Sequence, residues 1–234
     1  MAQSPDSRVP TPDTLTCVEV QTRDRPDASV IWLHGLGADG YDFLPVVREL
    51  ESMGAPAMRY VFPHAPTMPV TINGGYVMRA WYDILGTDLV RREDEASIRA
   101  SQAAVERLIA RETGRGVARA RIVLAGFSQG AAITLQTGLR QVEPLAALMV
   151  LSGYLPLADS LSAERALQSA RVPIFMAHGA SDPVIPIARA TASRDRLHSL
   201  GYAVQWHEYP MQHSLSAEEL GDIAAFFSAV LPPL

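Results

Sequence analysis

The amino-acid sequence predicts an α/β fold built on one mostly parallel central sheet with helices on both faces. The chain has 234 residues, 48% of them hydrophobic, which is long enough for one sizeable core and too short for two typical domains. Short apolar runs, typical of strands buried on both faces, alternate with segments whose apolar residues recur at helical spacing. Strands separated by helices imply right-handed parallel crossovers, which place helices on both faces of one sheet.

Composition excludes several classes of protein. A net charge of −5, with 20 basic and 25 acidic residues spread along the chain, provides no basic stripe for nucleic acid. The start lacks the features of a secretory signal, no apolar run is long enough to span a membrane, and the single cysteine, Cys17, allows no internal disulfide. We therefore expect a cytoplasmic protein that neither binds nucleic acid nor inserts stably into a membrane. Residues 1–14, rich in Pro, Ser, Asp and Thr, are expected to be a flexible leader to a single domain at 15–234.

The first half of the domain contains two predicted strands, two predicted helices and a long loop. The apolar run 29–34 stops at glycines and predicts a central strand, and the spacing of apolar residues in 41–50 predicts a short helix. A short strand is expected at 59–62. The segment 64–82 contains prolines and two adjacent glycines and predicts a long irregular excursion, of the kind that often has a functional role. The longest helix is expected at 93–115, which ends near glycines.

The second half repeats the strand and helix pattern. A buried strand is expected at 121–126, and the helix behind it at 128–141 is rich in Ala, Leu and Gln, which are good helix formers. Further strands are predicted at 146–152, 172–178 and 203–209, with helices at 187–199 and 217–229.

The pentapeptide Gly126-Phe-Ser-Gln-Gly130 lies between a predicted strand and a predicted helix, which is the context of the Gly-x-Ser-x-Gly nucleophile elbow. A sharp turn of this kind forces the serine into a strained backbone conformation, and residues without a Cβ fit beside it. It would project Ser128 above the carboxyl edge of the sheet, where a helix N-terminus favours negative charge. A glycine-flanked turn can also arise by chance among 16 glycines, but the strand and helix context favours a nucleophile.

A serine hydroxyl is a weak nucleophile at neutral pH, so the hypothesis requires a histidine base within hydrogen-bond reach. Four histidines follow Ser128. His198 falls in a predicted helix beside arginines, His207 lies within a predicted strand, and His178 ends a strand, where we expect a structural role beneath the acid loop. His213 lies in a loop between the last strand and the last helix and is the predicted base.

The predicted acid that orients this base is Asp182. It follows the strand 172–178, and its spacing from Ser128 and from His213 leaves room for one βα unit on each side. This gives the order nucleophile, acid, histidine that α/β-hydrolases show along the chain. The alternative for an Asp before Pro is a turn or helix-capping role.

An oxyanion hole requires two preorganised donors. The first predicted donor is the backbone N–H of Gln129, directly after the nucleophile. The second is the N–H of Leu36, in the glycine-containing loop 34–37 after the first strand. Its alternative is an ordinary glycine turn.

Together these residues resemble the carboxylesterase and acyl-protein thioesterase family, small lidless α/β-hydrolases also described as lysophospholipases. The resemblance covers nearly the whole chain, and the Asn-Gly-Gly and Trp-Tyr-Asp forms are closest to its bacterial carboxylesterase branch. It rests on motifs that occur in the family's order: Val30-Ile-Trp-Leu-His-Gly-Leu-Gly-Ala-Asp39, Pro63-His-Ala-Pro66, Pro69-Val-Thr-Ile-Asn-Gly-Gly75, Trp81-Tyr-Asp-Ile84, Gly126-Phe-Ser-Gln-Gly130, Ser152-Gly-Tyr-Leu-Pro156 and His178-Gly-Ala-Ser-Asp-Pro183.

The resemblance implies an α/β-hydrolase fold with no large lid domain, a Ser128, Asp182, His213 triad, and no metal or organic cofactor. It also implies that a homodimer can form near the acyl groove. It implies an acyl-binding groove built from the loop around Val70 to Trp81, from Tyr154 and Leu155, and from Val184. The residues expected to bind the acyl group are Val70, Trp81, Tyr154, Leu155 and Val184. Two positions depart from the family pattern: Met68 replaces a common basic residue, and Tyr154 stands where a tryptophan is frequent.

The sequence thus predicts a serine carboxylesterase that hydrolyses small-molecule esters or acylated substrates through an acyl-enzyme. An acyl-protein thioesterase or lysophospholipase acting on longer acyl chains is the alternative within the same chemistry. A non-catalytic binding module is disfavoured because all three triad positions are intact, and a dienelactone hydrolase would require a cysteine where this chain has Ser128.

Overall fold

The structure is a computed structural model that describes residues 15–86 and 93–233, so the leader expected at 1–14 lies outside the described residues. Within these ranges the chain forms strands, helices and short 3₁₀ segments in the alternating order that the sequence predicts. The elements are β1 (Cys17–Gln21), β2 (Ser29–Leu33), α1 (Leu44–Ser52), β3 (Arg59–Pro63), β4 (Thr67–Val70), η1 (Thr71–Asn73), β5 (Tyr76–Arg79), α2 (Glu95–Gly114), η2 (Arg119–Arg121), β6 (Ile122–Phe127), α3 (Gln129–Gly138), β7 (Ala147–Leu151), α4 (Leu161–Glu164), η3 (Leu167–Arg171), β8 (Ile174–Gly179), α5 (Ile187–Ser199), β9 (Val204–Tyr209) and α6 (Ala217–Val230).

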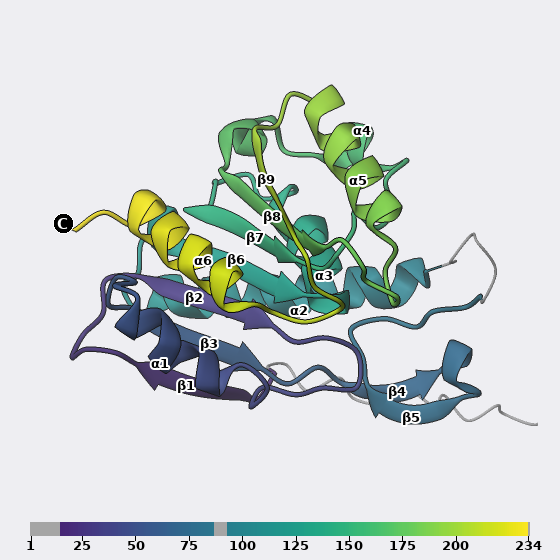
Figure 1. The fold of residues 1–234 in the computed structure, drawn as a ribbon, viewed down its shortest axis with the longest axis horizontal. Coiled ribbons are helices and arrows are strands. Elements are labelled where there is room, and N and C mark those ends of the chain that lie inside the picture. Colours follow the sequence, from purple (N-terminus) through teal and green to yellow (C-terminus); the bar gives the residue numbers. More distant parts are fainter. Residues whose placement is uncertain (1–14, 87–92, 234) are drawn as a thin grey trace, which may run out of the picture.

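The main sheet has seven strands in the order β1-β3-β2-β6-β7-β8-β9 (Figure 1). β1 pairs antiparallel with β3, and every other neighbouring pair is parallel. Because a parallel pair needs a crossover, a helix or longer connection separates the parallel neighbours in the chain. This is the mostly parallel sheet that the sequence predicts.

Helices cover both faces of the sheet, and each face has its own apolar core. On one face α1 and α6 pack side by side over alternate strand residues such as Val30 and Trp32. On the other face α2, α3 and α5 cover the intervening residues, such as Ile31 and Leu33. Successive strand side chains point to opposite faces, so a fully buried five-residue strand such as β2 supplies both cores.

The segment 64–82 is more regular than the sequence predicts. It contains a two-stranded antiparallel hairpin of β4 and β5, which projects from the side of the molecule in Figure 1. Gly74 and Gly75 turn the chain between the two strands with φ values of 67° and 79°, in the left-handed region that glycine tolerates best. The prediction of an irregular loop was wrong because the paired strands are short and one of them contains Pro69, which is tolerated at a sheet edge.

The parallel strands position the candidate site. The carboxyl ends of β2, β6, β8 and β9 lie at one edge of the sheet, and four of the loops that leave this edge contain the chain's predicted catalytic and oxyanion residues. In the described ranges, no helix is both long enough and apolar enough to cross a membrane.

Candidate active site

The turn after β6 holds Ser128 in a strained backbone conformation. Its φ and ψ angles are 56° and −117°, which a non-glycine residue adopts only when its surroundings enforce it. The Ser128 N–H donates to the carbonyl of Leu151 at the end of β7, at 2.9 Å, which fixes the turn to the sheet. Ser128 then caps α3 with its side chain free of any capping bond.

Both glycines of the elbow are required by close backbone contacts. A Cβ on Gly126 would overlap the backbone of Gly130, and a Cβ on Gly130 would overlap the carbonyl oxygens of Leu33 and His34. The elbow therefore packs directly against the end of β2. This contact brings the loop that follows β2 next to the nucleophile.

Three side chains form a continuous hydrogen-bond chain at the sheet edge. His213 Nε2 lies 2.9 Å from Ser128 Oγ, and His213 Nδ1 lies 2.6 Å from Asp182 Oδ2. A carboxylate can only accept, so Nδ1 carries the proton and Nε2 is left to accept from the serine hydroxyl. The ring of His213 packs against Phe127, with centroids 4.8 Å apart. The structure thus brings together the three residues predicted from the sequence.

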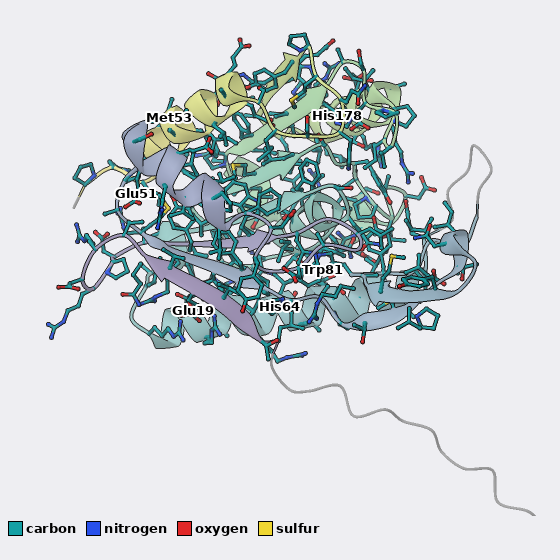
Figure 2. The ribbon with its side chains drawn as sticks, turned by 60° about the horizontal axis from the view of Figure 1, so that its bottom comes forward. Glu19, Glu51, Met53, His64, Trp81 and His178 are labelled. Atoms are coloured by element: carbon teal, nitrogen blue, oxygen red, sulfur yellow. The ribbon has the colours of Figure 1, made fainter. Side chains whose placement is uncertain are left out.

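The loop after β8 fixes the carboxylate of Asp182. Its Oδ1 accepts from the N–H groups of Val184 and Ile185, at 2.8 and 2.9 Å, which leaves Oδ2 directed at His213. Beneath it, His178 Nε2 donates to the Ile185 carbonyl at 2.8 Å and lies 3.4 Å from Asp182 Oδ2. Burial lowers the pKa of His178, so this ring is neutral next to the acid. Figure 2 shows His178 inside the molecule, as its structural role requires.

The loop after β2 lies against the nucleophile: a Cβ on Gly35 would be 3.4 Å from the Cβ of Ser128, and Leu36 lines the same cavity as Ser128. His34 Nδ1 donates to the carbonyl of Gly35 at 2.7 Å, and His34 Nε2 accepts from the N–H of Ala65 at 3.0 Å. Because the peptide bond is planar and trans, the Gly35 carbonyl and the Leu36 N–H point in opposite directions, so His34 fixes the orientation of this donor. Burial lowers the pKa of His34 to about 4 and keeps it in this neutral form.

The two predicted oxyanion donors have no acceptor within the described part of the chain. Gln129 is the first residue of α3, so its N–H has no intrahelical partner, and no acceptor is present for the Leu36 N–H. Unpaired donors beside a nucleophile are suited to hold an oxygen that becomes negative during a reaction.

Trp81 supports the site from behind. Its indole N–H donates to the His34 carbonyl at 2.8 Å, its backbone N–H donates to the Gln129 side chain at 2.8 Å, and its carbonyl accepts from Ser101. Trp81 is fully buried, whereas Met53, at the end of α1, is exposed; both are labelled in Figure 2. It holds the segment before α2 against the elbow.

A cavity of about 170 Å³ opens next to Ser128. Most of its lining surface is apolar, and the polar groups come from two tyrosines, Asn73, Gln129 and Ser128 itself. The residues that line it are Leu36, Ile72, Asn73, Tyr82, Ile84, Ser128, Gln129, Tyr154, Val184 and Ile185.

Of the five residues expected to bind the acyl group, Tyr154 and Val184 line this cavity, whereas Val70, Trp81 and Leu155 do not and are buried elsewhere. The Trp81 indole is instead bonded to the His34 carbonyl, at 2.8 Å. Its neighbour Tyr82 and, two residues further on, Ile84 line the cavity. Ile72 and Asn73 also line the cavity, and both lie in the loop from Val70 to Trp81 that the family resemblance places in the groove. The lining residues that sequence reasoning did not name as part of the site are Tyr82, Ile84 and Ile185.

The remaining histidines after Ser128 lie outside the site. His198 is exposed on α5, and His207 on β9 pairs with Asp222 at 3.2 Å and stacks on Phe175. In residues 15–86 and 93–233, no group of three or more His, Cys, Asp or Glu side chains is arranged to hold a metal ion.

Comparisons with known proteins agree with this geometry. A family model described as phospholipase/carboxylesterase matches residues 15–231. Acyl-protein thioesterase 1 of Neurospora crassa is 40% identical over 217 residues, covering 89% of each chain. The crystal structure of Arabidopsis thaliana SOBER1 superposes with a TM-score of 0.83 at 29% identity, covering 87% of this chain and 99% of that one. Zea mays acyl-protein thioesterase 2 gives a TM-score of 0.81 at 26% identity, covering 92% and 99%.

Proposed function

Because this chain belongs to the phospholipase/carboxylesterase family of α/β-hydrolases, and is accordingly a serine hydrolase of ester or thioester bonds, we propose that it is a carboxylesterase acting on small acyl esters. Ser128 is the nucleophile, His213 the general base and Asp182 the orienting acid. The observation that carries the proposal is the hydrogen-bond chain from Ser128 Oγ through His213 to Asp182, with bonds of 2.9 and 2.6 Å.

In the acylation half of the proposed cycle, Ser128 Oγ attacks the carbonyl carbon of the ester as its proton passes to His213 Nε2. The negative charge on the resulting tetrahedral oxygen is held by the N–H groups of Leu36 and Gln129. Asp182 stabilises the imidazolium of His213. The intermediate collapses when His213 gives its proton to the leaving alcohol, and the acyl group stays on Ser128.

In the deacylation half, water takes the place of the alcohol. His213 accepts a proton from the water, whose oxygen attacks the acyl carbon, and the same two N–H groups hold the second oxyanion. His213 then returns the proton to Ser128 Oγ as the acid leaves. The products are one carboxylic acid and one alcohol, and the enzyme regains its starting protonation.

The size of the cavity supports small acyl groups. Its volume of about 170 Å³ is close to the roughly 150 Å³ of an engineered cavity that binds benzene. Its mostly apolar lining suits a hydrocarbon chain of a few carbons or an aromatic ring. A palmitoyl chain would extend beyond this volume.

A second candidate is thioester hydrolysis on acylated proteins. It is favoured by the relative named acyl-protein thioesterase 1, which is 40% identical to this chain. The two candidates share the nucleophile and differ in the acyl length and in the leaving group. Cleavage of thioesters with long acyl chains at higher kcat/KM than short oxygen esters would favour this second candidate.

The first test is hydrolysis of p-nitrophenyl esters from acetate to palmitate at pH 7 to 8. We expect the highest kcat/KM on short esters and a loss of activity in Ser128→Ala by at least about 10⁴-fold, because removing the nucleophile of such a triad leaves only binding and oxyanion stabilisation. Ser199→Ala, an exposed serine on α5, is the matched control and should keep full activity. If the wild type is inactive on every ester and unreactive with a fluorophosphonate probe, the proposed function is wrong.

A further inference from the structure

We propose that Tyr82 and Tyr154 form a hydrogen-bonded wall of the acyl cavity that sets the length of acyl group the enzyme accepts, an inference that rests on the proposed esterase function. Both residues line the cavity beside Ser128, and they come from segments far apart in the sequence. Their hydroxyl oxygens lie 2.6 Å apart. The two side chains therefore meet as a single barrier.

The backbone on either side of this barrier is fixed. The Gln129 side chain donates to the carbonyl of Tyr82 at 2.6 Å, which ties this tyrosine to the residue directly after the nucleophile. On the other side, a Cβ at Gly153 would overlap the Ala131 side chain of α3, and the N–H of Leu155 donates to Ser193 Oγ at 2.9 Å. Tyr154 is thus held between α3 and α5.

A charged pair supports the wall from behind. The guanidinium carbon of Arg189 lies 3.5 Å from the centroid of the Tyr154 ring, a cation–π contact, and Arg189 forms an ion pair with Glu93. These contacts join α5 and the residue that precedes the N-cap of α2 to the tyrosine ring. A ring held on its face by a cation, and at its hydroxyl by a second tyrosine, has little freedom to move away from an incoming acyl chain.

Both hydroxyl groups stay protonated, so the bond between them persists over the working pH range. Burial raises the pKa of Tyr82 well above its usual value, and the neighbouring Tyr154 raises it further. Burial also raises the pKa of Tyr154 to about 12, with Glu93 contributing in the same direction. A longer acyl chain would have to separate these two hydroxyls and break the buried bond between them.

The test measures the ratio of kcat/KM for p-nitrophenyl octanoate to that for p-nitrophenyl butanoate. Tyr82→Phe and Tyr154→Phe remove one hydroxyl each and keep the ring, and each should raise the ratio by about fourfold, the factor for one additional buried methylene. Tyr154→Leu removes the ring and should raise the ratio by tenfold or more. Tyr202→Leu is the control: this buried tyrosine lies outside the cavity lining, so its ratio should equal that of the wild type.

Each rate is divided by the concentration of active enzyme, titrated with a fluorophosphonate, so that partly unfolded variants do not distort the comparison. An unchanged ratio in all three wall variants, with an active wild type, overturns the wall but leaves the proposed function standing. A ratio that rises equally in Tyr202→Leu also overturns it, since the effect is then one of general loosening. A wild type without esterase activity overturns both proposals.

Discussion

Two loop regions meet at Ser128, and a buried histidine supports each of them. On the oxyanion side, both ring nitrogens of His34 are bonded, to Gly35 and Ala65. On the acid–base side, Nε2 of His178 bonds to Ile185, while its buried Nδ1 has no partner among the residues that the structure describes. The histidine of the first region is thus held through both of its ring nitrogens, and the histidine of the second region is held through only one.

This difference in hydrogen bonding corresponds to the charge that develops on each side during the proposed cycle. The oxyanion side receives a negative charge on a substrate oxygen, and it needs donors whose direction does not change. The acid–base side receives a proton on His213, and it needs a carboxylate with no competing cation nearby. Burial lowers the pKa of both supporting histidines and keeps them neutral. Neutral His34 can accept from Ala65 and so orients the oxyanion donor, whereas neutral His178 places no positive charge next to Asp182.

The largest expected effect comes from breaking the acid–base side with Asp182→Asn. The amide can donate to His213 Nδ1, which would favour the wrong tautomer and leave the imidazolium without its counter-ion. We expect kcat for a short p-nitrophenyl ester to fall by about 10⁴-fold, as in other serine triads. Steady-state kinetics with the purified variant checks this.

Asp222→Asn is the matched control, since Asp222 also pairs with a histidine, His207 at 3.2 Å, but outside the cavity. It should keep a kcat near that of the wild type. An Asp182→Asn variant that retained more than a tenth of wild-type kcat would show that this side does not supply the acid.

The meeting of these two sides could be predicted from the sequence because it depends on topology. Parallel strands end at one sheet edge, so an elbow after one strand and polar loops after two others must converge there. The Gly-x-Ser-x-Gly pattern fixes the position of the nucleophile within its loop, and Ser128, Asp182 and His213 follow in chain order. Local signals and the parallel direction of the strands were together sufficient.

The cavity wall could not be predicted to the same extent. Trp81 and Tyr82 lie side by side in a bend, and both are aromatic, so composition does not distinguish which of them lines the cavity. Their placement is set by contacts with distant residues, including Gln129 and Ser101. Ile72 and Asn73 lie in the loop that was expected to form the groove, but the hairpin that brings them to the cavity was not predicted, because its short strands carry a weak pattern.

A second, smaller effect is expected on the oxyanion side. His34→Ala removes the bond that orients the Gly35 carbonyl and therefore the Leu36 N–H. Since loss of one oxyanion donor costs about 10² to 10³ in kcat, a misdirected donor should lower kcat by about 10²-fold with a smaller change in KM. His34→Asn places an amide N–H near the position of Nδ1 and should recover part of the loss. Equal kcat values in the two variants, or a change confined to KM, would argue against an orienting role.

The smallest effect is expected from His178→Asn. This variant tests whether His178 only positions the loop around Asp182 or also takes part in proton transfer. Loss of the bond to Ile185 should loosen a residue that lines the cavity, so KM should rise about threefold to tenfold, with kcat nearly unchanged. A kcat that fell as far as in Asp182→Asn would instead place His178 in the proton transfer itself.

The same variant tests the charge of His178 through its effect on stability. Burial lowers the pKa of the folded histidine below its ordinary 6.5, so just below pH 6.5 the unfolded chain binds a proton that the folded chain does not. The free energy of unfolding should therefore fall as the pH drops from 7 to 5, and fall less steeply in His178→Asn. Urea unfolding at both pH values measures the two slopes. Equal slopes would mean that the protonation of His178 does not contribute to the change in the free energy of unfolding with pH. The two supporting histidines would then differ only in their hydrogen bonds.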